Sequence, residues 1–144
     1  MSSSKGNTHV ASRLGSSALS HYGKWRDAMR WQRSLDRALR SLSLTHTRLL
    51  VLASLDTAIR RADDAVPLSA IAEEAGLDRG TASSVLQSLE KLGLVDRGGV
   101  NSEDQRALRV WITRKGERVL DAAVPLAEAA AAATPAPDRV RAKS

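Results

Sequence analysis

The sequence has no cysteine among its 144 residues and only three histidines. Without cysteine the chain cannot form a disulfide, a thiolate metal site or a thiol redox switch. This composition fits the reducing cytoplasm, where we expect the protein to work. The histidines His9, His21 and His46 lie far apart in the sequence, so we expect no metal site.

Long apolar runs are absent as well. No stretch approaches the roughly 18 apolar residues that a membrane-spanning helix needs, and residues 1–17 lack the apolar core of a signal peptide, so we expect neither a membrane span nor export. Phosphate-binding loops, dinucleotide fingerprints and paired catalytic carboxylates are also missing. Ser88–Lys91 matches an S-x-x-K nucleophile pattern without its partner motifs. We therefore predict no catalytic residues, no cofactor and no enzyme activity.

The charge of the chain favours a polyanionic partner. Its formal net charge is +6 and its pI is about 10.5. Residues 21–44 hold six basic and two acidic side chains, a net charge of +4, whereas residues 77–112 hold five of each and are neutral. The excess positive charge therefore lies in the amino-terminal part of the chain.

Residues 1–18 are rich in serine and glycine and show no periodicity, which predicts a disordered arm. Residues 19–42 predict a helix with two opposed stripes. The apolar stripe, which needs either the chain's own core or a second protomer as its partner, contains Ala28, Trp31, Leu35, Leu39 and Leu42. The arginine stripe, which is either a solvated face or a contact surface for DNA phosphates or an acidic neighbour, contains Arg26, Arg30, Arg33, Arg37 and Arg40.

The spacing of apolar residues predicts three further helices. Thr45 is expected to cap a helix over 45–61, a short strand is expected at 66–68, and Ser69 is expected to cap a helix that ends at Gly76. Asp78 or Thr81 is expected to cap the next helix, residues 79–92, whose inward stripe is Ala82, Val85, Leu86, Leu89 and Leu92.

The outward face of the helix over 79–92 is short, polar and almost uncharged. It carries Thr81, Ser83, Ser84, Gln87 and Ser88. Such side chains approach base edges closely and form hydrogen bonds with them. The alternative is that serine and threonine are simply common near the start of a helix.

A β-hairpin is expected after this helix. Leu94 and Val95 begin one strand, a polar turn follows Arg97 and reaches about Gln105, and residues 107–113 alternate between apolar and polar sides. Thr113 is expected to cap a helix over 114–133 that kinks or restarts at Pro125. Residues 135–144 form a basic tail. The order predicts a mainly α fold, a winged helix–turn–helix with a small β-hairpin wing.

A dense set of residues between positions 25 and 125 matches one family pattern. The set is Leu44-Thr45, Leu49, Leu52, Ile71-Ala72, Gly76-Leu77-Asp78, Thr81, Leu86, Leu89-Glu90, Gly93-Leu94-Val95, Arg97, Asp104-Gln105-Arg106, Ile112-Thr113 and Gly116. The chain thereby resembles the MarR family of bacterial transcription regulators. The resemblance implies one MarR-like domain over 19–134, with a DNA-binding lobe at 45–113 between dimerisation helices at 19–43 and 114–133.

The resemblance also implies the partners. It implies a homodimer on double-stranded DNA with a pseudo-palindromic operator, the helix 79–92 in the major groove and the wing 94–113 in the minor groove. The expected DNA contacts are Arg79, Thr81, Ser83, Ser84, Gln87, Ser88, Arg97, Asp104 and Arg106, with phosphate contacts from Arg26, Arg30 and Arg33. Most relatives carry Arg or Lys on the recognition helix, where this chain has Ser84 and Ser88. We expect the family's usual final dimerisation helix to be absent.

Two other interpretations stay open. The winged helix is alternatively a protein-interaction module without specific DNA binding, although the Asp104–Arg106 pair of the wing favours DNA. Many MarR-like regulators bind small aromatic effectors, and Trp25, Trp31 and Trp111 are candidates to line such a site, although tryptophans at this spacing are more often core or interface. We expect Trp111 to pack beneath the helix at 19–42.

Overall fold

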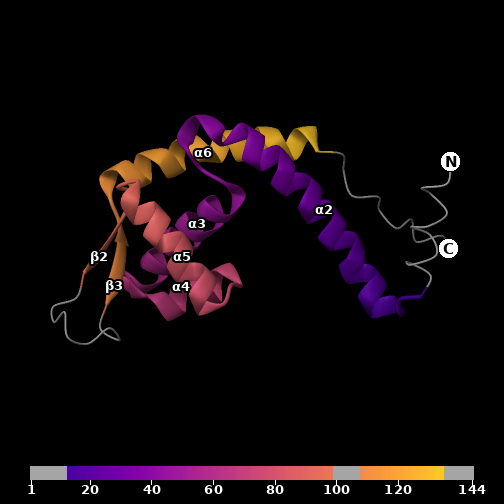
Figure 1. Ribbon diagram of the computed structural model, residues 1–144, viewed down its shortest axis with the longest axis horizontal. Coiled ribbons are helices and arrows are strands. Elements are labelled where there is room, and N and C mark those ends of the chain that lie inside the picture. Colours follow the sequence, from indigo (N-terminus) through magenta and orange to yellow (C-terminus); the bar gives the residue numbers. More distant parts are fainter. Residues whose placement is uncertain (1–12, 99–107, 135–144) are drawn as a thin grey trace.

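The computed structural model describes residues 13–98 and 108–134, and Figure 1 shows a helical arrangement with a small sheet at one end. In chain order the elements are α2 (Ser16–Ala38), η1 (Arg40–Leu42), α3 (His46–Ala62), β1 (Val66–Pro67), α4 (Leu68–Ala75), α5 (Arg79–Lys91), β2 (Val95–Gly98), β3 (Arg109–Ile112) and α6 (Arg114–Ala133). This order confirms the predicted mainly α, winged helix–turn–helix fold.

The sheet is antiparallel, with the strand order β1-β3-β2. Val66 of β1 pairs with Val110 of β3, and on the other side Val95 of β2 pairs with Ile112. Val110 is buried and Arg109 beside it is exposed, as the alternation in the sequence predicts. The short strand expected at 66–68 is therefore present, and it joins the sheet to the start of α4.

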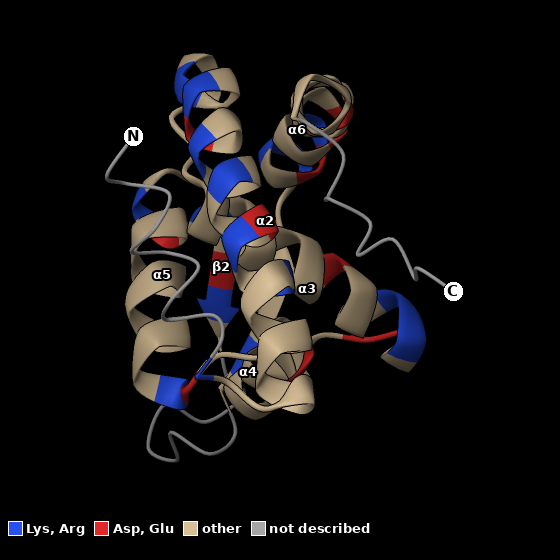
Figure 2. Ribbon diagram, turned by 90° about the vertical axis from the view of Figure 1, so that its right-hand side faces the viewer, with Lys and Arg blue, Asp and Glu red and all other residues tan. Residues whose placement is uncertain are grey.

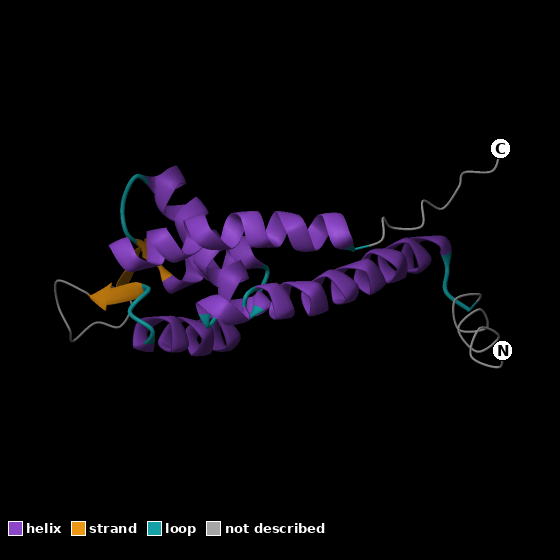
Figure 3. Cartoon of the chain, turned by 90° about the horizontal axis from the view of Figure 1, so that it is seen from above, coloured by secondary structure: helices purple, strands orange, loops and turns teal. Residues whose placement is uncertain are grey.

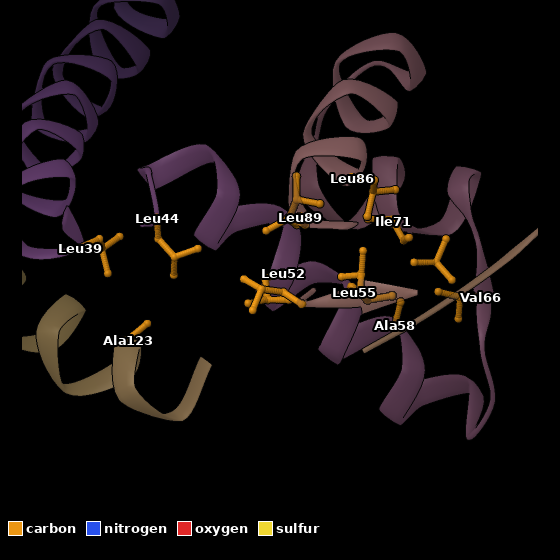
Figure 4. Packing of buried hydrophobic residues seen from close by; sticks show 14 of the residues in the cluster. Leu39, Leu44, Leu52, Leu55, Ala58, Val66, Ile71, Leu86, Leu89 and Ala123 are labelled. Carbon is orange, nitrogen blue, oxygen red and sulfur yellow. The ribbon is translucent and has the colours of Figure 1, made fainter. Parts of the chain in front are cut away.

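The core lies around α3, which is packed between the helix–turn–helix and the sheet. Leu52 and Leu55 of α3 are fully buried, and Ile71 of α4 and Leu86 and Leu89 of α5 close over them (Figure 4). Burial of each such side chain contributes about 1.5–3 kcal/mol to folding. This packing fixes α5 by its inner face and leaves its outer face free.

Side chains and backbone conformation set the helix ends. Thr45 accepts a hydrogen bond from the amide of Arg48, and Thr113 accepts one from the amide of Gly116, as predicted for N-caps. Gly76 ends α4 in the left-handed region at φ 69°. The prediction that Ser69 caps α4 is wrong. Pairing with β3 continues through Pro67, so the helix begins at Leu68 and Ser69 lies within its first turn.

Helix α2 differs from the prediction at both ends. It begins at Ser16, within the segment predicted to be disordered, while residues 1–12 lie outside the described residues. Its α-helix ends at Ala38, and the separate turn η1 leads to Ser43, whose φ is 56°. The chain therefore changes direction before α3. In α6, the restart expected at Pro125 as the alternative to a kink is wrong, because one helix runs from Arg114 to Ala133 with Pro125 inside it.

The carboxyl-terminal end of α2 packs against α6. Leu39 and Leu44 face Ala123 of α6, and all three are buried (Figure 4). At the end of α6, the hydroxyl of Thr134 donates to Ser34 Oγ at 3.4 Å. From there the amino-terminal part of α2 extends away from the other helices (Figures 1 and 3). Of the apolar stripe predicted over residues 19–42, only Leu35 and Leu39 are buried.

Hydrogen bonds between Asp36 and His46 hold α2 against the start of α3. The carboxylate of Asp36 accepts a hydrogen bond from the backbone amide of His46 at 2.7 Å, and its Oδ1 lies 2.9 Å from His46 Nδ1. Partial burial alone would raise the pKa of Asp36, but the two contacts with His46 and the charge of Arg40 outweigh it and lower that pKa. The direction of α2 is therefore fixed by polar contacts as well as by packing.

Candidate nucleic-acid interface

The amino-terminal end of α5 is capped by Asp78. Its Oδ1 accepts a hydrogen bond from the backbone amide of Thr81, and its Oδ2 accepts one from the Thr81 hydroxyl, each at 2.8 Å. These hydrogen bonds lower the pKa of Asp78. Of the two caps that the sequence allowed, Asp78 is the one used, and Thr81 supports it with its side chain.

The outer face of α5 presents short polar side chains to solvent. Ser84 and Gln87 are exposed and lie one helical turn apart, and Arg79 is exposed at the first residue of the helix. Ser83 is half-buried on the side that faces the wing. Figure 2 shows that most of α5 carries neither acidic nor basic residues. This face is sterically open and rich in hydrogen-bonding groups, but it supplies little positive charge.

Ser88 has a different environment from Ser84. Its hydroxyl donates to the carbonyl of Val85 at 2.7 Å and accepts a hydrogen bond from Arg48 Nε at 3.2 Å. Arg48 also donates through Nη1 to the carbonyl of Ser43 at 2.9 Å. Ser88 is half-buried between α3 and α5, and its hydroxyl already has partners within the protein. It connects two helices instead of lying free on the outer face.

Strand β2 places Arg97 beside the carboxyl-terminal half of α5. The Nη2 of Arg97 lies 3.2 Å from Glu90 Oε1, and its Nε lies 3.5 Å from Glu90 Oε2. The side chain of Arg97 is 23% exposed and that of Glu90 is 41% exposed. The guanidinium thus has one edge on the carboxylate of Glu90, and this contact joins the wing to α5.

A groove of about 940 Å³ runs between α5 and the wing. We call it the α5–wing groove. Its polar lining residues are Ser69, Arg79, Ser83, Gln87, Glu90 and Arg97. Its apolar floor includes Leu86, Leu108 and Val110. The structure therefore brings Arg79, Ser83, Gln87 and Arg97, all predicted from the sequence, to one concave surface.

The remaining predicted contacts lie elsewhere. Asp104 and Arg106 fall within residues 99–107, outside the described residues. Arg26, Arg30 and Arg33 are exposed on α2. They do not line the α5–wing groove.

The sequence interpretation missed a second apolar strip on α2. Tyr22, Trp25 and Met29 follow one another at spacings of three and four, and the rings of Tyr22 and Trp25 meet edge to face at 6.3 Å. Trp25 is 64% exposed and Met29 is 46% exposed, and Trp31 on the predicted stripe is 39% exposed. The helical spacing of these three residues is a usable signal in the sequence, but unlike the predicted stripe it does not continue into the buried Leu35 and Leu39.

Trp111 does not pack beneath α2, so that expectation is wrong. It pairs with Asp96 of β2, and its ring lies across Gly98, where a Cβ atom would come within 2.9 Å of the indole. Glycine at position 98 therefore provides the space for this ring. Trp111 belongs to the wing, and α2 leaves the core on the far side of α3 (Figure 1).

The described residues contain no group of three or more His, Cys, Asp or Glu side chains that could hold a metal ion. Within the same ranges, no helix has both the length and the apolar character needed to cross a membrane.

Comparison with known proteins finds the same helix–turn–helix in transcriptional regulators. Residues 57–99, from the end of α3 to β2, match the family model described as the IclR helix-turn-helix domain. Over 104 residues the chain is 29% identical to an uncharacterized HTH-type transcriptional regulator, YdcH, from Bacillus subtilis strain 168, an alignment that covers 72% of this chain and 69% of that protein.

Two solved structures share the fold. A MarR-family transcriptional regulator from Silicibacter pomeroyi superposes with a TM-score of 0.64 at 28% identity, covering 83% of this chain and 76% of that one. The regulator MosR from M. tuberculosis, in a complex with DNA, superposes with a TM-score of 0.58 at 31% identity, covering 73% of this chain and 71% of that one. Both similarities extend from the helix–turn–helix into the flanking helices.

Proposed function

The chain belongs to the MarR family of winged helix–turn–helix transcriptional regulators, and on that premise we propose that it binds double-stranded DNA sequence-specifically as a homodimer. In the proposed complex α5 lies in a major groove, and the wing of residues 94–113 lies in the adjacent minor groove. The observation that carries the proposal is the outer face of α5, which is open and polar on a helix whose inner face is locked into the core.

Base recognition is assigned to Gln87 and Ser84. A glutamine side chain forms a bidentate pair with the N6 and N7 atoms of adenine, and a serine hydroxyl donates to or accepts from either base of a pair. Both side chains are exposed, and neither has a side-chain hydrogen bond to the described residues. Thr81 and Ser88, whose hydroxyls are engaged within the protein, are assigned supporting roles in place of direct base contact.

The phosphate contacts are divided between three places. Arg79 and Arg97 lie at the α5–wing groove, and Arg106, which lies outside the described residues, is assigned to the minor groove. Arg26, Arg30 and Arg33 add the positive charge that α5 lacks. Because each phosphate contact releases counterions, every lost contact reduces the slope of log affinity against log salt by about 0.9.

The homodimer is proposed from the exposed apolar residues of α2. Trp25, Met29 and Trp31 are large apolar side chains of α2 that remain exposed in the single chain, and Val124 of α6 is exposed as well. Large exposed aromatic patches are costly in a monomer and typical of interfaces. A two-fold dimer places the two copies of α5 about one helical turn of DNA apart, ~34 Å, on a pseudo-palindromic site.

A small aromatic effector is a further part of the proposal. In the proposed dimer the indoles of Trp25 and Trp31 border the contact between the protomers, where they offer stacking faces to an aromatic ring, and the neighbouring arginines of α2 offer partners for a carboxylate. Titration with benzoate and 4-hydroxybenzoate, read by tryptophan fluorescence, tests this part. If the tryptophan fluorescence does not change at high concentrations of either compound, the proposed effector site is contradicted.

The experiment that tests the function is selection of genomic fragments by the purified protein, followed by affinity measurements at several salt concentrations. We expect recovery of a shared pseudo-palindromic sequence, bound at least about 1,000-fold more tightly than unrelated duplex. Binding to every duplex alike, or to none, would contradict the proposal and favour a protein-interaction module.

A further inference from the structure

The proposed complex fixes the position of one sugar–phosphate strand of the DNA relative to the protein. One sugar–phosphate strand separates a major groove from the adjacent minor groove. If α5 occupies the major groove and the wing occupies the minor groove, this DNA strand has to pass between α5 and the wing. That space on the protein is the α5–wing groove. The inference below rests on the proposed function.

We propose that the α5–wing groove receives a phosphate of this strand, and that Glu90 is a counter-charge which the phosphate displaces from Arg97. Glu90 then lowers the affinity of the protein for DNA. It acts as a positioning residue: it holds Arg97 in the groove before DNA arrives and competes with the phosphate afterwards.

The geometry of Arg97 suits an exchange of anions. Its Nε and Nη2 face the two carboxylate oxygens of Glu90 at 3.5 and 3.2 Å, the side-on arrangement in which arginine also binds phosphate. Both distances are long for charge-assisted hydrogen bonds, which are usually about 2.7–2.9 Å. With its side chain only 23% exposed, Arg97 has limited freedom to move elsewhere. A phosphate entering the groove therefore meets the guanidinium already in place.

The charges that line the α5–wing groove show whether Glu90 raises or lowers the affinity for DNA. Arg79 and Arg97 contribute two positive charges, and Glu90 contributes one negative charge. A phosphate that binds Arg97 leaves the Glu90 carboxylate, 41% exposed, close to a second negative group. Like charges at short range oppose binding, so removal of this carboxylate strengthens the complex.

A second ion pair of the same chemistry serves as a control. Arg61 Nη1 of α3 lies 3.1 Å from Glu74 Oε2 of α4. Neither residue lines the α5–wing groove. Glu74→Gln therefore removes one negative charge and one ion pair, as Glu90→Gln does, without changing the groove.

The test is a double-mutant cycle on DNA affinity with Glu90→Gln, Arg97→Gln and the double variant, using the selected duplex and an unrelated one. Glutamine keeps the length of Glu90 and still accepts a hydrogen bond from Arg97. We expect Glu90→Gln to bind both duplexes about two- to fivefold more tightly near 0.1 M salt and to steepen the salt slope by up to ~0.9. The gain should vanish in the Arg97→Gln background, and Glu74→Gln should bind as the parent does.

Two results would overturn the inference. One is a Glu90→Gln affinity that matches the parent or Glu74→Gln. The other is a gain that persists without Arg97, since this would reflect only long-range repulsion. Thermal unfolding of each variant shows whether it is folded. A parent that binds no duplex at all would instead contradict the proposed function.

Discussion

The guanidinium of Arg48 joins Ser88 of the recognition helix to the turn between α2 and α3. Its Nε donates to Ser88 Oγ at 3.2 Å, while its Nη1 donates to the carbonyl of Ser43 at 2.9 Å. The position of α5 is therefore tied to the direction of α2, the helix assigned to the dimer. In the proposed dimer, a change in the angle between the protomers would be transmitted to α5 through this contact.

Ser88→Ala tests that connection. We expect the free energy of unfolding to fall by about 0.5–1.5 kcal/mol, because Arg48 Nε loses its hydrogen-bond acceptor while Nη1 keeps the carbonyl of Ser43. DNA affinity should fall by the same factor for every base substitution in the site. Ser84→Ala, a matched control on the exposed face, should leave unfolding unchanged and alter preference at one base pair. A base-specific effect of Ser88→Ala would show that Ser88 contacts DNA directly.

Two glycines should respond to alanine in opposite directions. A Cβ atom at Gly116 would clash with the backbone carbonyl of Leu94 and the side chain of Ile112, so the backbone would have to shift and we expect a loss of about 1–3 kcal/mol. A Cβ atom at Gly23, within α2, meets nothing within 4 Å, and alanine should stabilise that helix by up to ~1 kcal/mol. Urea unfolding of both variants checks the prediction, and a tolerated Gly116→Ala would contradict the packing of α6 on the wing.

Acid should weaken the contact between α2 and α3. The pKa of Asp36 is lowered from its usual value of 3.8 in the folded chain, where His46 outweighs the effect of burial. The pair therefore contributes stability above pH 3.8, and this contribution is lost as the pH falls through the folded-state pKa. Asp36→Asn should be less stable than the parent near pH 6, by a modest amount because both side chains are partly exposed. The difference should vanish at low pH, and a pH-independent difference would contradict this account.

The apolar strip of α2 formed by Tyr22, Trp25 and Met29 should control dimerisation. Trp25→Ala combined with Met29→Ala removes exposed apolar surface without touching the core, so we expect dimer dissociation at micromolar concentration with little change in helix content. Sedimentation of the variant beside Arg37→Ala, an exposed control on the same helix, measures this. A parent that sediments as a monomer would contradict the dimer.

The elements of this fold follow from local sequence signals. The caps Thr45 and Thr113, the left-handed Gly76 and the inward stripe of α5 all depend on neighbours within a few residues, and each was predicted. The start of α4 was not predicted correctly, because it depends on pairing between β1 and β3, which lie more than 40 residues apart in the sequence.

The site was predictable in composition but not in its connections. Spacing on a helix shows which residues lie outward, and it placed Gln87 and Ser84 correctly on the exposed face. It does not show that Ser88 meets Arg48, or that Arg97 meets Glu90, because each pair depends on how two elements pack. The direction of α2, and with it the exposure of Trp25, depends on the turn at Ser43.

The central claim is that the exposed face of α5 recognises DNA bases. Affinities of the parent and Gln87→Ala for every single-base substitution of the selected half-site test it most directly. We predict that the parent discriminates at one A·T pair by about 1–3 kcal/mol, and that Gln87→Ala loses this discrimination there while keeping it elsewhere. An identical pattern of preferences for the two proteins would contradict the claim.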